Sequence, residues 1–186
     1  MRVLGVSGSL REASHNRKLL RAAASLLPPE ARFTEYERLK AIPPFDEDDE
    51  PSPPAAVEDW RAAIAEADAI LFATPEYNSS IPGQLKNAID WASRPFKETV
   101  LRNKPAAVVG ASTSMFGAVW SQAELRKALG AAGARVVDRE LPVAGAQEAF
   151  DEHGRLLDHD LSLELESILA ELLDEVRQRS EVALKG

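Results

Sequence analysis

The chain has 186 residues, 45% of them hydrophobic, and is therefore long enough to bury a sizeable core as one domain spanning residues 1–186. It contains no cysteine, which excludes disulfides, thiol nucleophiles and cysteine-bound metal or iron–sulfur centres. Its formal net charge of −8, and the lack of any apolar run near the ~20 residues of a membrane helix, indicate a cytoplasmic protein whose main partner is neither nucleic acid nor membrane.

Short apolar runs alternate with longer helical patterns along the chain. Five of these runs predict strands, and they begin at Val3, Ala31, Ala69, Ala106 and Arg135. Apolar residues at helical spacing lie between several of the runs, and a last helical stripe follows Leu165. Such an alternation predicts a parallel sheet that is covered by helices on both faces.

Five strands and about five helices are typical of a flavodoxin-like, three-layer, doubly wound α/β fold. We therefore expect a five-stranded parallel sheet with strand order 2-1-3-4-5. Ligands bind such sheets beyond the carboxyl ends of the strands, near the point where the strand order reverses. Three polar loops leave those ends, at residues 7–15, 74–82 and 111–118, so we expect a site where they meet.

The first loop, SGSLREASHN at residues 7–16, has the composition of an anion site. It offers the hydroxyls of Ser9 and Ser14, the forked cation of Arg11, and the free N–H groups of a helix start. Because neither G-x-G-x-x-G nor a Walker A sequence occurs, a terminal phosphomonoester such as that of FMN fits better than a pyrophosphate. The alternative is ordinary helix capping by Ser14 or Asn16, with Arg11 in solvent.

The second loop opens the stretch PEYNSSIPGQLKNAIDW, residues 75–91, whose first half is polar and whose second half is helical. Pro75 and Pro82 stiffen the polar half, and Tyr77 supplies a flat amphipathic face. Such a loop suits a planar, carbonyl-rich ring, although Tyr77 could instead pack at the sheet edge. We interpret Trp91 as a core or interface residue.

The segments GSLREASHNRKL and PEYNSSIPGQLKNAIDW closely resemble two motifs of the NADPH-dependent FMN reductase family, which includes quinone, chromate and azo-dye reductases. The resemblance extends over most of the chain. It implies FMN as cofactor, NADPH or NADH as co-substrate, a small-molecule electron acceptor, and a homodimer or homotetramer. The cofactor-binding residues that it implies are Ser9, Arg11, Ser14, His15, Asn16, Pro75, Glu76, Tyr77, Asn78, Ser79, Ser112 and Gly117.

The third loop departs from the family pattern at one position. Gly117 is followed by Ala118, where the family often has a second glycine, so the sequence leaves open how this loop approaches the flavin. Shortly after it, Ser121 and Glu124 have the spacing of a capping box and predict a helix start.

A flavin carries out hydride chemistry itself, so we expect no catalytic side chain and no metal. The expected reaction passes hydride from NADPH or NADH, through FMN, to a quinone, free flavin, azo compound or chromate. The alternatives are an FMN-holding electron carrier of the flavodoxin type without NAD(P)H turnover, and a nucleotide-responsive binding module. The segment DEHGRLLDHD, residues 151–160, matches no standard metal site, and we expect a polar loop that caps the last helix.

Overall fold

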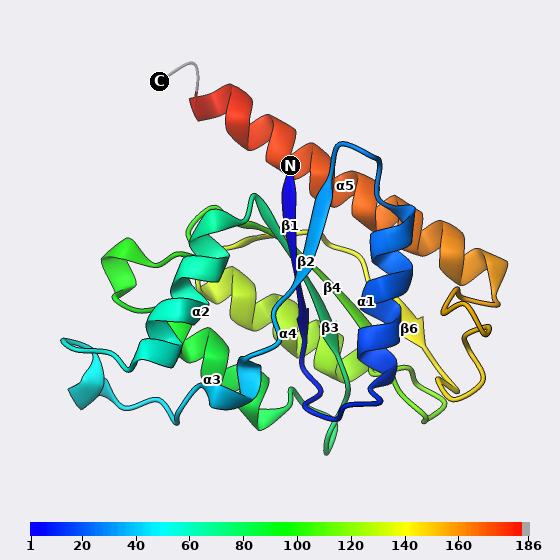
Figure 1. Cartoon of the computed structure of the whole chain (residues 1–186), viewed down its shortest axis with the longest axis horizontal. Helices are drawn as coiled ribbons and strands as arrows, with labels where there is room; N and C mark the ends of the chain where they lie inside the picture. The colour runs from blue at the N-terminus through cyan, green and yellow to red at the C-terminus, as the bar shows by residue number, and fades with distance from the viewer. Residues whose placement is uncertain (184–186) are drawn as a thin grey trace.

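A parallel sheet forms the centre of the computed structural model, which describes residues 1–183 (Figure 1). The sheet has the order β2-β1-β3-β4-β5, and β6 also pairs with β4, so the expected strand order is confirmed. The strands are β1 Arg2–Ser7, β2 Arg32–Glu35, β3 Ala69–Thr74, β4 Pro105–Ala111, β5 Arg135–Val136 and β6 Pro142–Val143. Because all the pairs are parallel, the carboxyl ends of these strands lie at one edge.

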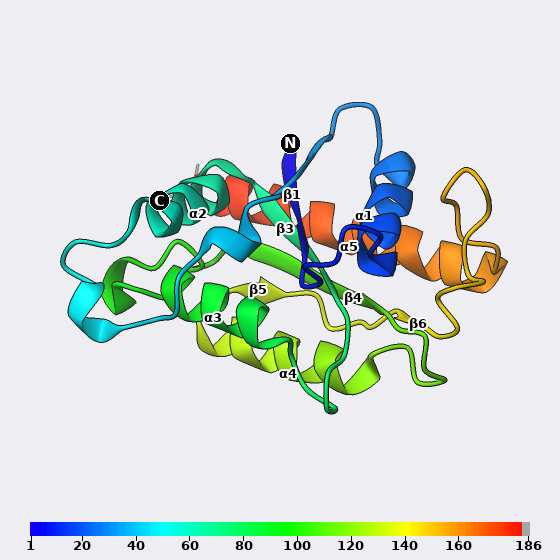
Figure 2. The same ribbon diagram turned by 60° about the horizontal axis from the view of Figure 1, so that its bottom comes forward.

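Helices cover both faces of the sheet (Figures 1 and 2). They are α1 His15–Leu26, α2 Ala55–Glu66, α3 Gly83–Ala92, α4 Val119–Ala131 and α5 His159–Ala183. Residues of α1 and α5 pack on one face, and residues of α2, α3 and α4 pack on the other.

The central strands are apolar throughout because each of their two faces meets a helical layer. In β3, Ala69, Leu71 and Ala73 belong to the core under α1 and α5. Ile70 and Phe72, which point the opposite way, belong to the core under α2, α3 and α4. All residues of β3 are buried, which explains why its sequence shows no polar alternation.

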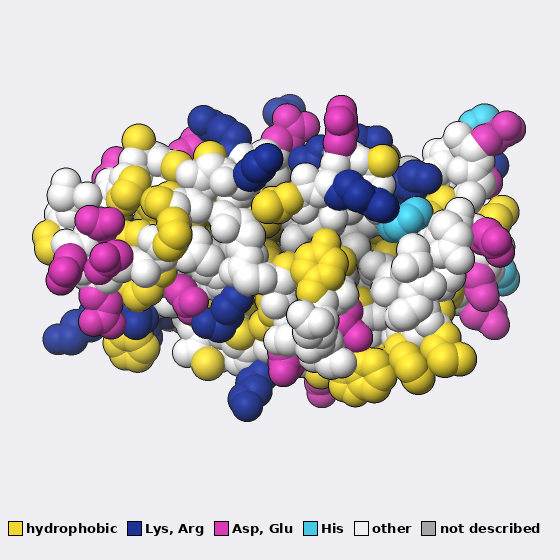
Figure 3. All heavy atoms as spheres, turned by 90° about the horizontal axis from the view of Figure 1, so that it is seen from below, with side chains coloured by type: hydrophobic (Ala, Val, Ile, Leu, Met, Phe, Trp, Pro, Cys, Tyr) yellow, Lys and Arg dark blue, Asp and Glu magenta, His cyan; other side chains and the backbone are white. Residues whose placement is uncertain are grey.

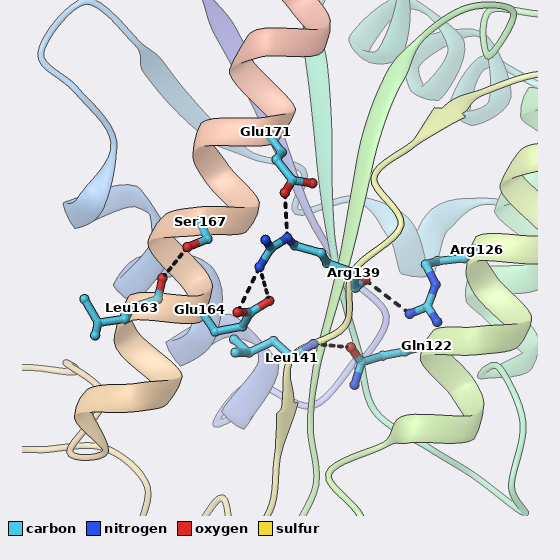
Figure 4. Close-up of polar contacts among 8 residues, drawn as sticks. All are labelled: Gln122, Arg126, Arg139, Leu141, Leu163, Glu164, Ser167 and Glu171. Atoms are coloured by element: carbon cyan, nitrogen blue, oxygen red, sulfur yellow. Dashed lines mark hydrogen bonds and ion pairs between the residues drawn. The ribbon is translucent and has the colours of Figure 1, made fainter.

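The fifth strand of the sheet is interrupted. β5 pairs with the start of β4 and β6 with its end, while the segment between them leaves the ladder. Figure 4 shows what holds this segment: Arg139 is bound to Glu164 and Glu171 of α5, and the Leu141 N–H donates to Gln122 Oε1 of α4 at 2.9 Å. The single strand expected from Arg135 is therefore two short ones, because charged residues between them turn toward the flanking helices.

The polar segment before α5 caps that helix, as the sequence predicted. Asp158 Oδ1 accepts hydrogen bonds from Asp160 N–H at 2.9 Å and from Leu161 N–H at 3.1 Å. Trp91 is fully buried and donates from Nε1 to the Pro43 carbonyl, which confirms its role in the core. No helix within residues 1–183 is both long enough and apolar enough to cross a membrane.

Candidate functional site

Three polar loops meet at the carboxyl edge of the sheet, at residues 8–14, 75–82 and 112–118. They enclose a hollow of about 190 Å³. Its lining includes every residue predicted for the site except Asn78, Ser79 and Gly117, and adds Ala111 and Thr113. Figure 3 views this edge face on and shows basic side chains beside a histidine, with acidic side chains at both ends of the molecule.

The first loop turns tightly and then starts α1. Ser9 N–H donates to Ser7 Oγ at 3.3 Å, and Arg11 N–H donates to Ser9 Oγ at 3.4 Å. Ser14 is the N-cap of α1, with its Oγ accepting from Asn16 N–H at 3.2 Å. Ser14 therefore caps the helix and lines the hollow at the same time, so the two interpretations of this loop are compatible.

Asn16 ties the first loop to the third. Its Nδ2 donates to the Ala111 carbonyl, and its Oδ1 accepts from Ala111 N–H, both at 2.9 Å. Asn16 is buried, so these bonds replace water contacts that its carboxamide would otherwise make. This clamp sets the end of β4, and with it the start of the loop that carries Ser112, at a fixed distance from α1.

Two arginines near the start of α1 have different surroundings. Arg17 forms an ion pair with Glu35, with Nε and Oε1 2.9 Å apart, and so faces β2. Arg11 is the arginine that lines the hollow, and its side chain has no ion-pair partner within the described part of the chain. Arg11 and the N-terminus of α1 therefore contribute positive potential at the hollow, and Lys18 adds to it at His15.

His15 lies beside Arg11 in the same lining. Its Nδ1 is buried and has no hydrogen-bond partner among the residues that the structure describes. Burial lowers the pKa of His15, and the nearby charges of Arg11 and Lys18 lower it further. An orphaned nitrogen and an unpaired arginine at a helix N-terminus fit a phosphate group, which would supply the missing acceptor and charge.

The second loop ends in a tight hairpin turn. Tyr77 and Ser80 exchange both backbone hydrogen bonds, at 3.2 and 3.1 Å, across a turn formed by Asn78 and Ser79. Both turn residues have positive φ, 52° and 58°, as a two-residue hairpin turn of the primed type requires. This conformation puts Asn78 and Ser79 at the tip and outside the lining, whereas Tyr77 lines the hollow and is 54% exposed.

The third loop faces the hollow through Ser112 and Thr113, and Gly117 serves a different contact. Gly117 has φ +57°, and a Cβ there would lie 2.3 Å from the carbonyl carbon of Pro142 in β6. Ala118 also has a left-handed backbone, with φ 63°. The glycine is thus required by packing against β6, and it does not line the hollow.

Helix α4 begins without a cap of its own, and the predicted capping box is wrong. Its N-cap residue is Ala118, and Ser121 is buried in the first turn, where its hydroxyl meets Thr74 Oγ1 at 2.9 Å. Glu124 instead accepts a hydrogen bond from Ser80 Oγ.

The cap of α4 comes from Glu76, whose Oε2 accepts from Trp120 N–H at 3.0 Å and Ser121 N–H at 3.1 Å. A local sequence pattern could not predict this cap, because Glu76 lies 44 and 45 positions before the two N–H donors in α4.

Comparison with known proteins agrees with the geometry. A family model described as NADPH-dependent FMN reductase matches residues 1–148. The chain is 47% identical over 160 residues to an NAD(P)H-dependent FMN reductase of Pseudomonas aeruginosa, covering 85% of each chain. It is 32% identical to a 2-hydroxy-1,4-benzoquinone reductase of a Burkholderia species, covering 96% of this chain and 98% of that one. The solved structure of a flavoenzyme NAD(P)H:(acceptor) oxidoreductase from Paracoccus denitrificans matches with a TM-score of 0.83 at 33% identity, over 95% of this chain and 97% of that chain.

Proposed function

The chain belongs to the NADPH-dependent FMN reductase family, and we propose that it passes electrons from NADPH or NADH, by way of bound FMN, to a small-molecule acceptor. The observation that carries this proposal is the hollow itself. Both family motifs contribute to one lining, with a cationic end at Arg11 and a wall of loop residues at Pro75 to Tyr77. A flavin mononucleotide has the same division, an anionic phosphate at one end and a planar ring at the other.

The phosphate end consists of Ser9, Arg11, His15 and the first turn of α1. The hydroxyl, the guanidinium and the free N–H groups of that turn are all donors, as a phosphomonoester requires. Burial and the nearby cations lower the pKa of His15 and so disfavour its charged form, and an anion beside it would offset this effect. This end therefore binds the cofactor and leaves the reacting atoms to the other end.

The ring end consists of Pro75, Glu76 and Tyr77 on one side, with Ser112 and Thr113 on the other. When bound, FMN supplies hydride acceptance and donation, so the side chains are needed for binding and orientation only. The proline and the buried strand behind it make the wall rigid, because β3 is buried at every residue. Tyr77 lines the hollow and is half exposed, so this side of the hollow is open to solvent and to a second reactant.

Among acceptors, we propose a quinone. Relatives named for quinone reduction include a quinone reductase of Pseudomonas putida that is 39% identical over 82% of this chain. Phe116 in the third loop and Trp120 in the first turn of α4 are both about half exposed, and their ring centroids lie 4.9 Å apart with the ring planes inclined by 60°. Both rings expose apolar area, which suits a quinone better than the chromate anion.

Steady-state kinetics on FMN-loaded protein tests the proposal. We expect NADPH or NADH oxidation that depends on a benzoquinone, exceeds the rate with chromate, an azo dye or free FMN, and disappears when the protein is stripped of FMN. Flavin-loaded protein that oxidises neither nicotinamide with any acceptor would instead be an electron carrier. Protein that stays colourless after incubation with FMN and desalting would contradict both. We also propose a homodimer or homotetramer, to be checked by light scattering.

A further inference from the structure

The N-terminus of α4 depends on a residue from another loop. Its N-cap, Ala118, has no side-chain oxygen and makes no capping hydrogen bond, in contrast to Ser14 at the start of α1. The first N–H groups of any helix lack intrahelical partners, and they carry the positive end of the helix dipole. Without an outside acceptor, α4 would begin with exposed, unpaired donors beside the hollow.

Glu76 is this outside acceptor. One of its oxygens, Oε2, accepts from both Trp120 N–H and Ser121 N–H, at 3.0 and 3.1 Å. Glu76 is partly buried and lines the hollow between Pro75 and Tyr77. Glu76 therefore caps the N-terminus of α4 and also lines the hollow.

Two more contacts fasten the same loop to α4. Thr74 Oγ1 and Ser121 Oγ are 2.9 Å apart at the base of the loop, and Ser80 donates to Glu124 near its tip. Glu76 is the middle contact of the three along the chain, and unlike Thr74 and Ser80 it lines the hollow. The second loop, which precedes α3 in the chain, is thus held in place by α4.

We propose that Glu76 is a positioning residue for the flavin ring and that its charge lowers the reduction potential of bound FMN. This inference rests on the proposed function. Reduction adds negative charge to a flavin, and a carboxylate in the wall of the site opposes that change. Glutamine at this position keeps an oxygen for the two N–H groups but removes the charge, which leaves the positive end of the α4 dipole unopposed.

Three variants separate the two roles. Glu76→Gln keeps the acceptor and loses the charge, Glu76→Ala loses both, and Ser80→Ala removes only the contact near the tip of the loop. For each, we would measure the reduction potential of bound FMN by dye equilibration, the FMN dissociation constant by fluorescence, and amide hydrogen exchange over residues 119–123.

We expect Glu76→Gln to raise the reduction potential while its FMN dissociation constant stays within about threefold of wild type, because an uncharged acceptor retains most of a cap. Glu76→Ala should weaken FMN binding by about tenfold, with faster exchange in the first turn of α4, and Ser80→Ala should match wild type in potential. An unchanged potential in Glu76→Gln would overturn the electrostatic role even if Glu76→Ala does not fold. Wild-type binding and exchange in Glu76→Ala would overturn the positioning role. Failure of the wild-type protein to bind FMN would contradict the proposed function instead.

Discussion

Asn16 at the start of α1 and Ala111 at the end of β4 are joined by a pair of hydrogen bonds, each 2.9 Å long, that uses both polar atoms of the asparagine side chain. The two residues adjoin different site loops and are 95 positions apart. The clamp therefore holds the cationic end of the hollow against the loop that carries Ser112. Because both bonds lie within the protein, these two parts of the site are positioned before FMN binds.

Loss of this clamp should destabilise the whole domain. Asn16→Ala leaves the buried N–H and C=O of Ala111 without partners, which we expect to lower the free energy of unfolding by about 3 kcal/mol. Urea denaturation measures the change. Ser25→Ala is the matched control because its hydroxyl bonds to a carbonyl near the other end of α1, and it should cost less than about 0.5 kcal/mol. Equal effects of the two variants would contradict a special role for Asn16.

Removal of Arg11 should weaken FMN binding without destabilising the apoprotein. Its exposed side chain has no ion-pair partner in the described part of the chain, so its removal should change the free energy of unfolding little. Loss of a charge-assisted contact to phosphate costs about 1.5–3 kcal/mol, and Arg11→Ala should therefore raise the FMN dissociation constant about tenfold to a hundredfold. Arg21→Ala makes the same charge change on an exposed position of α1 and should leave the constant near wild type. Full flavin occupancy of Arg11→Ala after desalting would show that Arg11 does not bind the phosphate.

His15 should make the apoprotein less stable as the pH decreases. Burial and the charges of Arg11 and Lys18 lower its pKa from the usual 6.5. The unfolded chain therefore takes up a proton at a higher pH than the folded chain, so His15 favours folding above pH 6.5 and loses this contribution as the pH falls through the lowered pKa. Urea denaturation at pH 7 and pH 5 should show a larger loss of stability for wild type than for His15→Gln.

Bound FMN should reverse the preference of His15 for the uncharged form, because a phosphate beside the ring favours the imidazolium. Calorimetry in buffers with different ionisation enthalpies should then detect proton uptake when FMN binds near pH 6.5. Riboflavin, which lacks the phosphate, is the control ligand and should bind without this uptake. The same proton uptake in His15→Gln would assign the effect to another group.

Lys104 should add stability at alkaline pH. Its Nζ donates to the carbonyls of Ala65 and Ala67 at the end of α2, and burial lowers its pKa to about 8 from 10.5. Between these two values the unfolded chain holds the proton and the folded chain does not, so the free energy of unfolding rises with pH. Denaturation from pH 7.5 to 10 should show this rise in wild type relative to Lys104→Met. Parallel curves would mean that Lys104 keeps its proton in the fold.

Much of the architecture could be predicted from the sequence because it depends on short-range patterns. Continuous apolar runs such as Ala69 to Ala73 identified the buried strands, and the polar residues that follow them marked the edge where the site forms. Ser14 could be placed as a cap for the same reason, since the atoms it bonds lie two residues away. Both family motifs then converged on one hollow, as parallel strands require.

The contacts that define the site in detail could not be predicted, because each joins segments far apart in the chain. The Asn16 clamp, the Glu76 cap and the approach of Gly117 to Pro142 depend on how loops from different strands lie beside one another. The capping-box prediction failed for the same reason. Its local spacing is correct, but Ser121 and Glu124 are already bonded to Thr74 and Ser80.

The interrupted strand between β5 and β6 also has a consequence for behaviour in solution. An edge strand offers a row of unpaired N–H and C=O groups on which another chain can add a strand. Here that row is broken, because residues 137–141 separate two pieces of two residues each. Arg139, which lies in this segment, extends its charged side chain to Glu164 and Glu171 of α5 (Figure 4). This edge of the sheet, short and interrupted by a charged segment, is therefore a poor template for the addition of a strand from another molecule.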